Sequence, residues 1–133
     1  MTKKLSKEPR VLGIIGSPRK KGNTSTLVAS ILEGAESAGA KAESVFLSSL
    51  EINPCIAGDK CQREDVCQYD DDMAMVFDLM KKSDVWVFGT PVYWWGPTAQ
   101  MKAFIDRWYA YQKPLKDLLQ DRRIILAIPF GDN

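Results

Sequence analysis

Residues 11–26 read VLGIIGSPRKKGNTST, and they place three different patterns one after another. The first five residues are apolar and mostly branched, which is typical of a strand buried on both faces of a parallel sheet. A loop of glycine, serine, proline and basic residues follows, from Gly16 to Gly22. Apolar residues then recur at helical spacing, and we expect Asn23 or Thr24 to cap that helix. The stretch therefore predicts a strand, a loop and a helix.

The same alternation of strand and helix continues along the chain. We expect further strands at residues 42–47, 85–89 and 123–129 and a helix that begins after Asp72, its cap. Such alternation predicts an α/β fold, a doubly wound parallel sheet that binds ligands beyond the carboxyl ends of its strands. Compared with that architecture, we expect the last strand and helix to be lacking or truncated. Residues expected to point inward are Met73, Val76, Phe77 and Met80, and, after residue 97, Met101, Phe104, Ile105 and Trp108.

The length of 133 residues is that of a single domain. We expect a flexible tail over residues 1–9 and one domain over residues 10–133. The composition, 45% hydrophobic and 26% charged, is that of a globular chain rather than a disordered one. A net charge of +1 provides no basic field for nucleic acid. The sequence shows no signal peptide and no membrane-spanning run, so we expect a cytoplasmic protein that binds no membrane.

The chain contains no histidine, which excludes Ser-His-Asp and Cys-His catalysis and the common zinc ligand sets. The chemistry must therefore come mostly from a bound group. The three cysteines are an odd number in a chain without a secretion signal. This count argues for free or liganding thiols rather than a disulfide framework.

The loop after the first strand has the features of a phosphate site. Backbone N–H groups and the positive end of a helix dipole face the same place, and the side chains of Ser17, Asn23, Thr24 and Ser25 add donors. The spacing matches neither a Walker A loop nor the Gly-x-Gly-x-x-Gly dinucleotide motif. The sequence thus predicts a cradle for a monophosphate. The alternative is a tight turn whose polar residues cap the helix and bind nothing.

A second distinctive loop, TPVYWWGP at residues 90–97, follows the third strand. Aromatic rings held by proline and glycine at a strand end favour a planar ligand or a protein partner. The alternative is that Trp94 and Trp95 cover the sheet or are buried in a subunit contact. Taken together, the two loops predict a site for a planar ring on a phosphorylated tail, as in FMN.

Three motifs in this order resemble the NADPH-dependent FMN reductase family, and in particular its iron-sulfur flavoproteins. They are GSPR with GNT at 16–24, DDM at 71–73, and TPVYW at 90–94 with QMKAFIDR at 100–107. The resemblance implies a flavodoxin-like fold that binds FMN. We expect Lys102, Asp106 and Arg107 to be structural, because a helix this far past the loop usually shows its charges to solvent or to an ion pair. By the same resemblance the phosphate would be held by Ser17, Arg19, Asn23, Thr24 and Ser25, and the isoalloxazine would be bordered by Pro91, Val92, Tyr93, Trp94 and Gly96.

Cluster-binding members of that family carry the motif Cys-x2-Cys-x2-Cys-x4-7-Cys. Here Cys55, Cys61 and Cys67 match the first, third and fourth positions, and Gly58 stands at the second. A four-iron cluster needs a fourth ligand, so we expect no iron–sulfur cluster and no metal at these residues. A three-iron or externally completed cluster and reactive thiols are the alternatives to a loop that serves packing or a subunit contact.

The resemblance implies an FMN-dependent NAD(P)H oxidoreductase that passes electrons through bound FMN to a small acceptor such as a quinone, a flavin, an azo compound or a nitro compound. The flavin itself carries the chemistry, so we expect no catalytic side chain, and backbone N–H groups of residues 93–96 are candidates to contact the ring. One alternative is a flavodoxin-type or iron-sulfur-flavoprotein electron carrier that acts on proteins, although a net charge of +1 offers little electrostatic steering. Another alternative is a binding module without flavin.

We also expect a homodimer or a larger homo-oligomer. The resembling family builds its flavin site at a dimer contact, and an aromatic patch of Trp95, Trp108, Tyr109 and Tyr111 would provide an interface if these side chains were exposed.

Overall fold

The computed structural model describes residues 8–131, which form a four-stranded parallel sheet between two layers of helices. The strands stand in the order β2-β1-β3-β4, and every neighbouring pair is parallel. Their bounds are Arg10–Ile15 for β1, Lys41–Phe46 for β2, Val85–Gly89 for β3 and Arg123–Ala127 for β4. The predicted α/β parallel sheet is confirmed.

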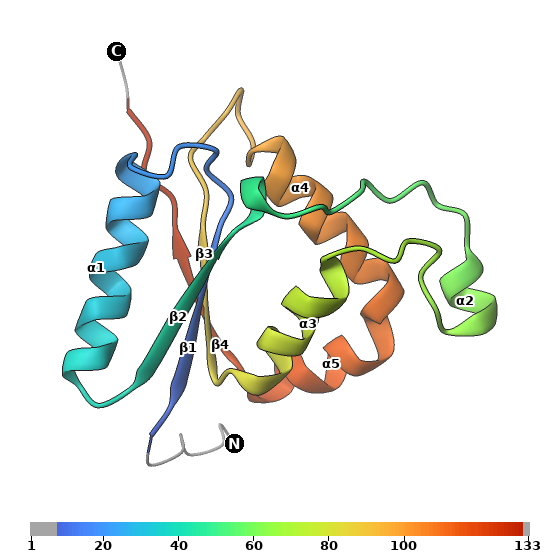
Figure 1. Ribbon diagram of the computed structural model, residues 1–133, viewed down its shortest axis with the longest axis horizontal. Coiled ribbons are helices and arrows are strands. Elements are labelled where there is room, and N and C mark those ends of the chain that lie inside the picture. The colour runs from blue at the N-terminus through green and yellow to red at the C-terminus, as the bar shows by residue number, and fades with distance from the viewer. Residues whose placement is uncertain (1–7, 132–133) are drawn as a thin grey trace.

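Helices cover both faces of this sheet (Figure 1). Helix α1 (Asn23–Ser37) lies alone on one face, while α3 (Met73–Lys82), α4 (Ala99–Asp106) and α5 (Gln112–Asp121) cover the other. The short α2 (Lys60–Glu64) projects away from the sheet on a long loop. Two 3-10 helices, η1 (Leu47–Ser49) and η2 (Arg107–Tyr111), complete the chain's regular elements in the described residues.

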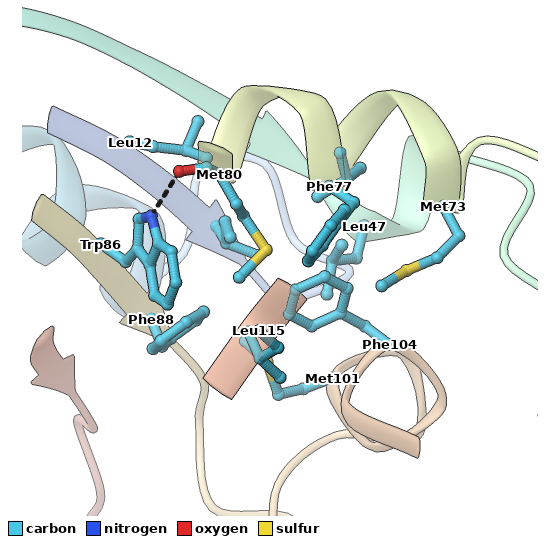
Figure 2. Close-up of a cluster of buried hydrophobic side chains, with 12 residues drawn as sticks. Leu12, Leu47, Met73, Phe77, Met80, Trp86, Phe88, Met101, Phe104 and Leu115 are labelled. Atoms are coloured by element: carbon cyan, nitrogen blue, oxygen red, sulfur yellow. Dashed lines mark hydrogen bonds between the residues drawn. The ribbon is translucent and has the colours of Figure 1, made fainter. Parts of the chain in front are cut away.

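The hydrophobic core is split in two by the sheet. On the side of α1, Val28 and Leu32 pack against Val11, Val85 and Val87. The larger core lies on the opposite side and is shown in Figure 2. There the indole Nε1 of the fully buried Trp86 donates a hydrogen bond of 3.0 Å to the carbonyl of Met80, which ties β3 to the end of α3. The inward stripe of α3 is confirmed, since Met73, Val76, Phe77 and Met80 are all buried.

Element boundaries differ from the sequence prediction in a few places. Strand β2 begins and ends one residue earlier than predicted, and β4 ends at Ala127 rather than Pro129. Helices α2 and α5 were not predicted, because both sequences are mostly polar. Helix α2 has no buried residue, and α5 has only one, Leu115. Residues 1–7 of the expected tail lie outside the described residues. The tail's last two residues contact β2, where Lys41 binds Glu8 by an ion pair of 2.8 Å and donates its N–H to the Pro9 carbonyl at 2.9 Å.

One expected inward position was wrong, and one expected capping residue takes its position without making the capping hydrogen bond. Ile105 is exposed, because the helical path of α4 turns it away from the core that Met101 and Phe104 enter. Asp72 stands at the N-cap of α3, but its carboxylate accepts from the Glu51 N–H at 2.7 Å instead. The carboxylate of Asp71 accepts from the first helical N–H, that of Met73, at 3.2 Å.

The expected aromatic patch does not form, because its members point in different directions. The ring of Trp108 packs against Phe88 and Phe104, and the ring of Tyr111 stacks on Phe77 at a centroid distance of 4.1 Å. Trp95 stands far out in solvent. In the described residues no helix is long and apolar enough to cross a bilayer.

Candidate functional site

The loops that follow β1 and β3 meet at the carboxyl edge of the sheet. The N–H of Gly16 donates to the carbonyl of Gly89 at 2.7 Å, and the hydroxyl of Thr98 donates to the carbonyl of Gly16 at 2.6 Å. A side chain at Gly16 would collide here, since its Cβ would lie 2.8 Å from the Cβ of Met101. Glycine at this position therefore lets α4 approach the first loop closely.

A cavity of about 630 Å³ opens between these two loops and the segment after β4. It brings together six of the residues that the sequence analysis assigned to FMN: Ser17, Arg19, Asn23, Thr24, Pro91 and Tyr93. It adds five that were not in that assignment: Lys21, Gly22, Pro129, Phe130 and Gly131. The last three stand directly after the fourth parallel strand, where such folds bind ligands.

The loop after β1 is held in shape by its own polar side chains. The Oγ of Ser17 accepts from the N–H of Arg19 at 3.2 Å, and the Oγ of Ser25 donates to the carbonyl of Arg19 at 2.8 Å. Ser17 lines the cavity, whereas Ser25 faces a different one, between α1 and β2. Ser25 was expected to hold the phosphate, and its hydroxyl here fixes the loop instead.

The start of α1 has the charge and the free donors that an anion requires. Gly22 is the N-cap and provides no side-chain hydrogen bond, so the predicted capping by Asn23 or Thr24 was wrong. No acidic residue stands in the first helical turn, and Arg19 and Lys21 line the cavity beside it. Helix N–H groups, a helix dipole and two cationic side chains together fit the dianionic phosphate of FMN.

The aromatic loop after β3 is a tight two-residue turn. Tyr93 and Gly96 exchange two backbone hydrogen bonds, of 2.9 and 3.2 Å. Trp94 and Trp95 occupy the central positions with φ of 47° and 66°, in the left-handed region that glycine and asparagine favour. Their side chains are 95% and 92% exposed, so they do not cover the sheet. Two bulky residues held in this conformation store backbone strain, a feature that concentrates at ligand-binding sites.

The predicted ring-binding residues divide into two groups. Pro91 and Tyr93 line the cavity, whereas Val92, Trp94 and Gly96 lie in the same loop but do not line the cavity. The indoles of Trp94 and Trp95 are exposed and do not line the cavity. The turn of residues 93–96 would therefore lie beside the edge of a planar group bound against Pro91 and Tyr93.

A buried ion pair lies at the C-terminal end of α4. Arg107 binds the carboxylate of Asp71 through two hydrogen bonds, of 2.6 and 3.0 Å, and both side chains are almost completely buried. Burial raises the pKa of Asp71, but the hydrogen bonds from Arg107, Asn53 and Met73 outweigh it and lower that pKa to about 2. The expected structural role of Arg107 in an ion pair fits this contact, and Lys102 and Asp106 pair on the surface at 2.6 Å.

Arg107 also reaches the cysteine-bearing segment between β2 and α3. Its Nη2 donates to the Sγ of Cys67 at 3.3 Å, and its guanidinium lies over the ring of Tyr69 at 4.9 Å. The three cysteines line one small cavity with these residues. Within residues 8–131 no three acidic, cysteine or histidine side chains are arranged to hold a metal ion.

Comparison with known proteins shows relatives over most of the chain. An iron-sulfur flavoprotein of Methanocaldococcus jannaschii is 40% identical over 98 residues, which cover 74% of this chain and 51% of the relative. An iron-sulfur flavoprotein of Methanosarcina thermophila is 38% identical over 98 residues, with 74% and 51% covered. The chain thus spans about half the length of these curated relatives.

Among solved structures, an NAD(P)H:quinone oxidoreductase from Methanothermobacter marburgensis superposes with a TM-score of 0.77 at 18% identity, over 95% of this chain and 66% of that one. This likeness shows a shared flavodoxin-like fold. Residues 9–128, nearly the whole chain, match the family of NADPH-dependent FMN reductases. Because this match covers nearly the whole chain, the chain belongs to the NADPH-dependent FMN reductase family.

Proposed function

We propose that FMN binds in the cavity between the loops after β1, β3 and β4. The phosphate is held by the N-terminal turn of α1 and by Arg19 and Lys21, and the isoalloxazine lies against Pro91 and Tyr93. The observation that carries this proposal is the single cavity that joins an uncapped, positively charged helix start to the aromatic turn. Phe130, which is 79% exposed at the cavity wall, offers a second apolar surface for the ring.

The chain's own contribution to the reaction is to bind and orient the flavin, which supplies the electron transfer chemistry when bound. The N–H groups of Tyr93 and Gly96 are used inside the turn. The donors that the turn itself does not use are therefore those of Trp94 and Trp95, and their left-handed backbone fixes the direction in which they point. We assign to these two N–H groups the stabilisation of negative charge at the polar edge of the ring.

We propose that the protein takes electrons from NAD(P)H and passes them to a small acceptor, such as a quinone, a flavin, an azo compound or a nitro compound. The exposed indoles of Trp94 and Trp95 support this choice, since they provide flat apolar surface beside the ring for a second planar molecule. A cytoplasmic location is part of the same proposal, because NAD(P)H is its electron donor.

We include a homodimer in the proposal. Strand β4 forms one edge of the sheet, and Ile124, Ile125 and Leu126 are 45%, 39% and 65% exposed. An edge strand with apolar side chains on both faces favours cover by another polypeptide. Light scattering on the purified protein measures the mass directly, and a monomer at working concentration would contradict this part.

The test of FMN binding replaces Asn23, at the mouth of the cradle, by phenylalanine. The matched control is Ser30→Phe, which adds the same ring to an exposed position of α1 outside the cavity. We expect wild type and the control to retain FMN and the Asn23 variant to lose it, as measured by absorption after desalting. Equal retention in both variants would contradict the phosphate assignment.

Anaerobic addition of NADPH to the FMN complex then tests the activity. Bleaching of the flavin absorption followed by recovery with a quinone is expected. Flavin that binds but is not reduced by NADPH or NADH would favour the electron carrier that acts on proteins. Protein that binds no FMN even on reconstitution would favour a binding module without flavin.

A further inference from the structure

Cys55, Cys61 and Cys67 come from three points of the segment between β2 and α3, yet they line the same cavity. Gly58 stands on the wall of this cavity as well. The enclosed volume is about 20 Å³, which accommodates one water molecule. A four-iron cluster, with eight core atoms, is far larger than this space.

The relatives named iron-sulfur flavoproteins raise the question of whether this chain can hold a cluster. Four-iron clusters in proteins are held by four cysteine thiolates. This chain has only three cysteines and no histidine that could replace the fourth. The residues present therefore do not fit a fully ligated four-iron cluster.

The missing cysteine of the motif would stand at position 58. The side chain of Gln68 occupies the space next to Gly58. A Cβ built on Gly58 would lie 2.5 Å from the Oε1 of Gln68, so the amide of Gln68 occupies the space of a side chain at position 58. The backbone does not require glycine there, because the left-handed residues of this turn are its neighbours, Ala57 and Asp59, with φ of 53° and 54°. The only obstacle to a side chain at position 58 is thus the end of the Gln68 side chain, which is flexible.

The remainder of the segment is anchored to the fold. Cys67 is held by Arg107, whose partner Asp71 is buried with it. At the other end of the segment, the side chain of Gln62 donates to the carbonyl of Tyr109 at 3.4 Å, and the hydroxyl of Tyr109 donates to Asp59 at 3.4 Å. A fourth thiol at position 58 would therefore join three thiols that line the same cavity, in a segment that is anchored to the fold near Cys67 and near α2.

We propose that the absence of a thiol at position 58 is why the three cysteines do not retain an iron–sulfur cluster, and that a cysteine at position 58 allows the segment between β2 and α3 to open and ligate one. It follows that electrons enter and leave through the flavin only, so the acceptor must reach the ring at the Trp94–Trp95 turn. This consequence rests on the proposed FMN function, whereas the statement about Gly58 does not.

The experiment compares wild type, Gly58→Cys and Gly58→Ala after anaerobic incubation with ferrous iron and sulfide, followed by desalting. Gly58→Ala is the matched control, since it adds the Cβ that displaces Gln68 but no sulfur. We expect about four iron and four sulfide per chain, with brown absorption, in Gly58→Cys only. Wild type and Gly58→Ala should hold no more iron than a variant with all three cysteines replaced by serine.

Iron and sulfide retained by wild type above that serine variant would overturn the proposal, whether as a three-iron or a four-iron cluster. So would a folded Gly58→Cys protein without a cluster, provided that Gly58→Cys combined with Gln68→Ala also lacks one. Circular dichroism verifies that each variant is folded. FMN content is measured separately, so a failure to bind FMN contradicts the proposed function without changing the result for iron.

Discussion

The hydroxyl of Thr98 donates a hydrogen bond of 2.6 Å to the carbonyl of Gly16, a residue 82 positions earlier in the chain. Thr98 is completely buried, and the same oxygen accepts from the N–H of Met101 at the start of α4. Its own N–H donates to the hydroxyl of Thr90 at 3.2 Å. One residue thus couples the loop after β1, the loop after β3 and the start of α4.

Replacing Thr98 by valine removes this coupling with little change of shape. The carbonyl of Gly16 would lose its buried donor, which costs about 1–3 kcal/mol of unfolding free energy. We expect a lower stability in chemical denaturation and weaker FMN binding in a fluorescence titration. Thr98→Ser keeps the hydroxyl and should restore FMN affinity to within about two-fold. Equal FMN affinity in wild type and the valine variant would show that the two loops are positioned independently.

Lys20 and Lys21 are neighbours in sequence but should differ in their effect on FMN. Lys21 lines the proposed FMN cavity, whereas Lys20 lines the cavity between α1 and β2, with its ammonium 6.0 Å from the ring of Phe46. Lys21→Ala should weaken FMN binding about ten-fold, as for a hydrogen bond to a charged group, and Lys20→Ala should leave it nearly unchanged.

The same titration with riboflavin, which lacks the phosphate, provides the control for this pair. Lys21→Ala should not weaken riboflavin binding, because the lost contact is to the phosphate. Equal losses for FMN and riboflavin would place Lys21 against the ring instead.

The strained turn at Trp94 and Trp95 should lower the stability of the FMN-free protein and support turnover with a quinone. Asn-Gly is the preferred pair for a two-residue turn with positive φ at both positions. Replacing both tryptophans by Asn-Gly should raise the unfolding free energy of the FMN-free protein by about 1–3 kcal/mol through relief of strain. Turnover with a quinone should fall, because the flat surface beside the ring is lost. A variant that is no more stable than wild type would refute the assignment of strain to this turn.

The ion pair of Asp71 and Arg107 predicts a loss of stability in acid. The pKa of Asp71 falls from an ordinary value of 3.8 to about 2 in the folded protein. The lowered pKa of Asp71 contributes about 2 kcal/mol to the free energy of unfolding. This contribution is fully present above pH 3.8 and is lost as the pH falls toward about 2. Denaturation at a series of pH values measures this slope.

Asp71→Asn should flatten that acid slope and lower the stability near pH 7 by about 3–5 kcal/mol, because Arg107 is left buried without its counter-charge. Asp78→Asn is the control. The pKa of Asp78 is also lowered, by a hydrogen bond from Lys81, but on the surface. Its replacement should change the acid slope much less. Equal slopes in the two variants would contradict the role of the buried pair.

The order of strands and helices could be predicted because each pattern is local. The apolar run of β1 and the spaced apolar residues of α3 need only neighbouring residues to identify them. Helix α5 was not predicted, because its local sequence does not show the buried face that identifies a helix. Apart from Leu115 its residues stand at the surface or only partly buried, and its inward face is defined by the larger core against which it packs.

The candidate site likewise has features that local sequence patterns reveal and features that depend on tertiary packing. The sequence alone determined that a phosphate-type loop and an aromatic loop follow the first and third strands, since strand ends, glycine spacing and residue types are read directly from the chain. Only the tertiary structure decided that Ser25 shapes the loop rather than lining the cavity, that Thr98 joins the two loops, and that Arg107 is buried against Asp71, 36 residues away. These contacts join residues distant in sequence or depend on which way a helix is rotated, and such information exists only once the layers pack together.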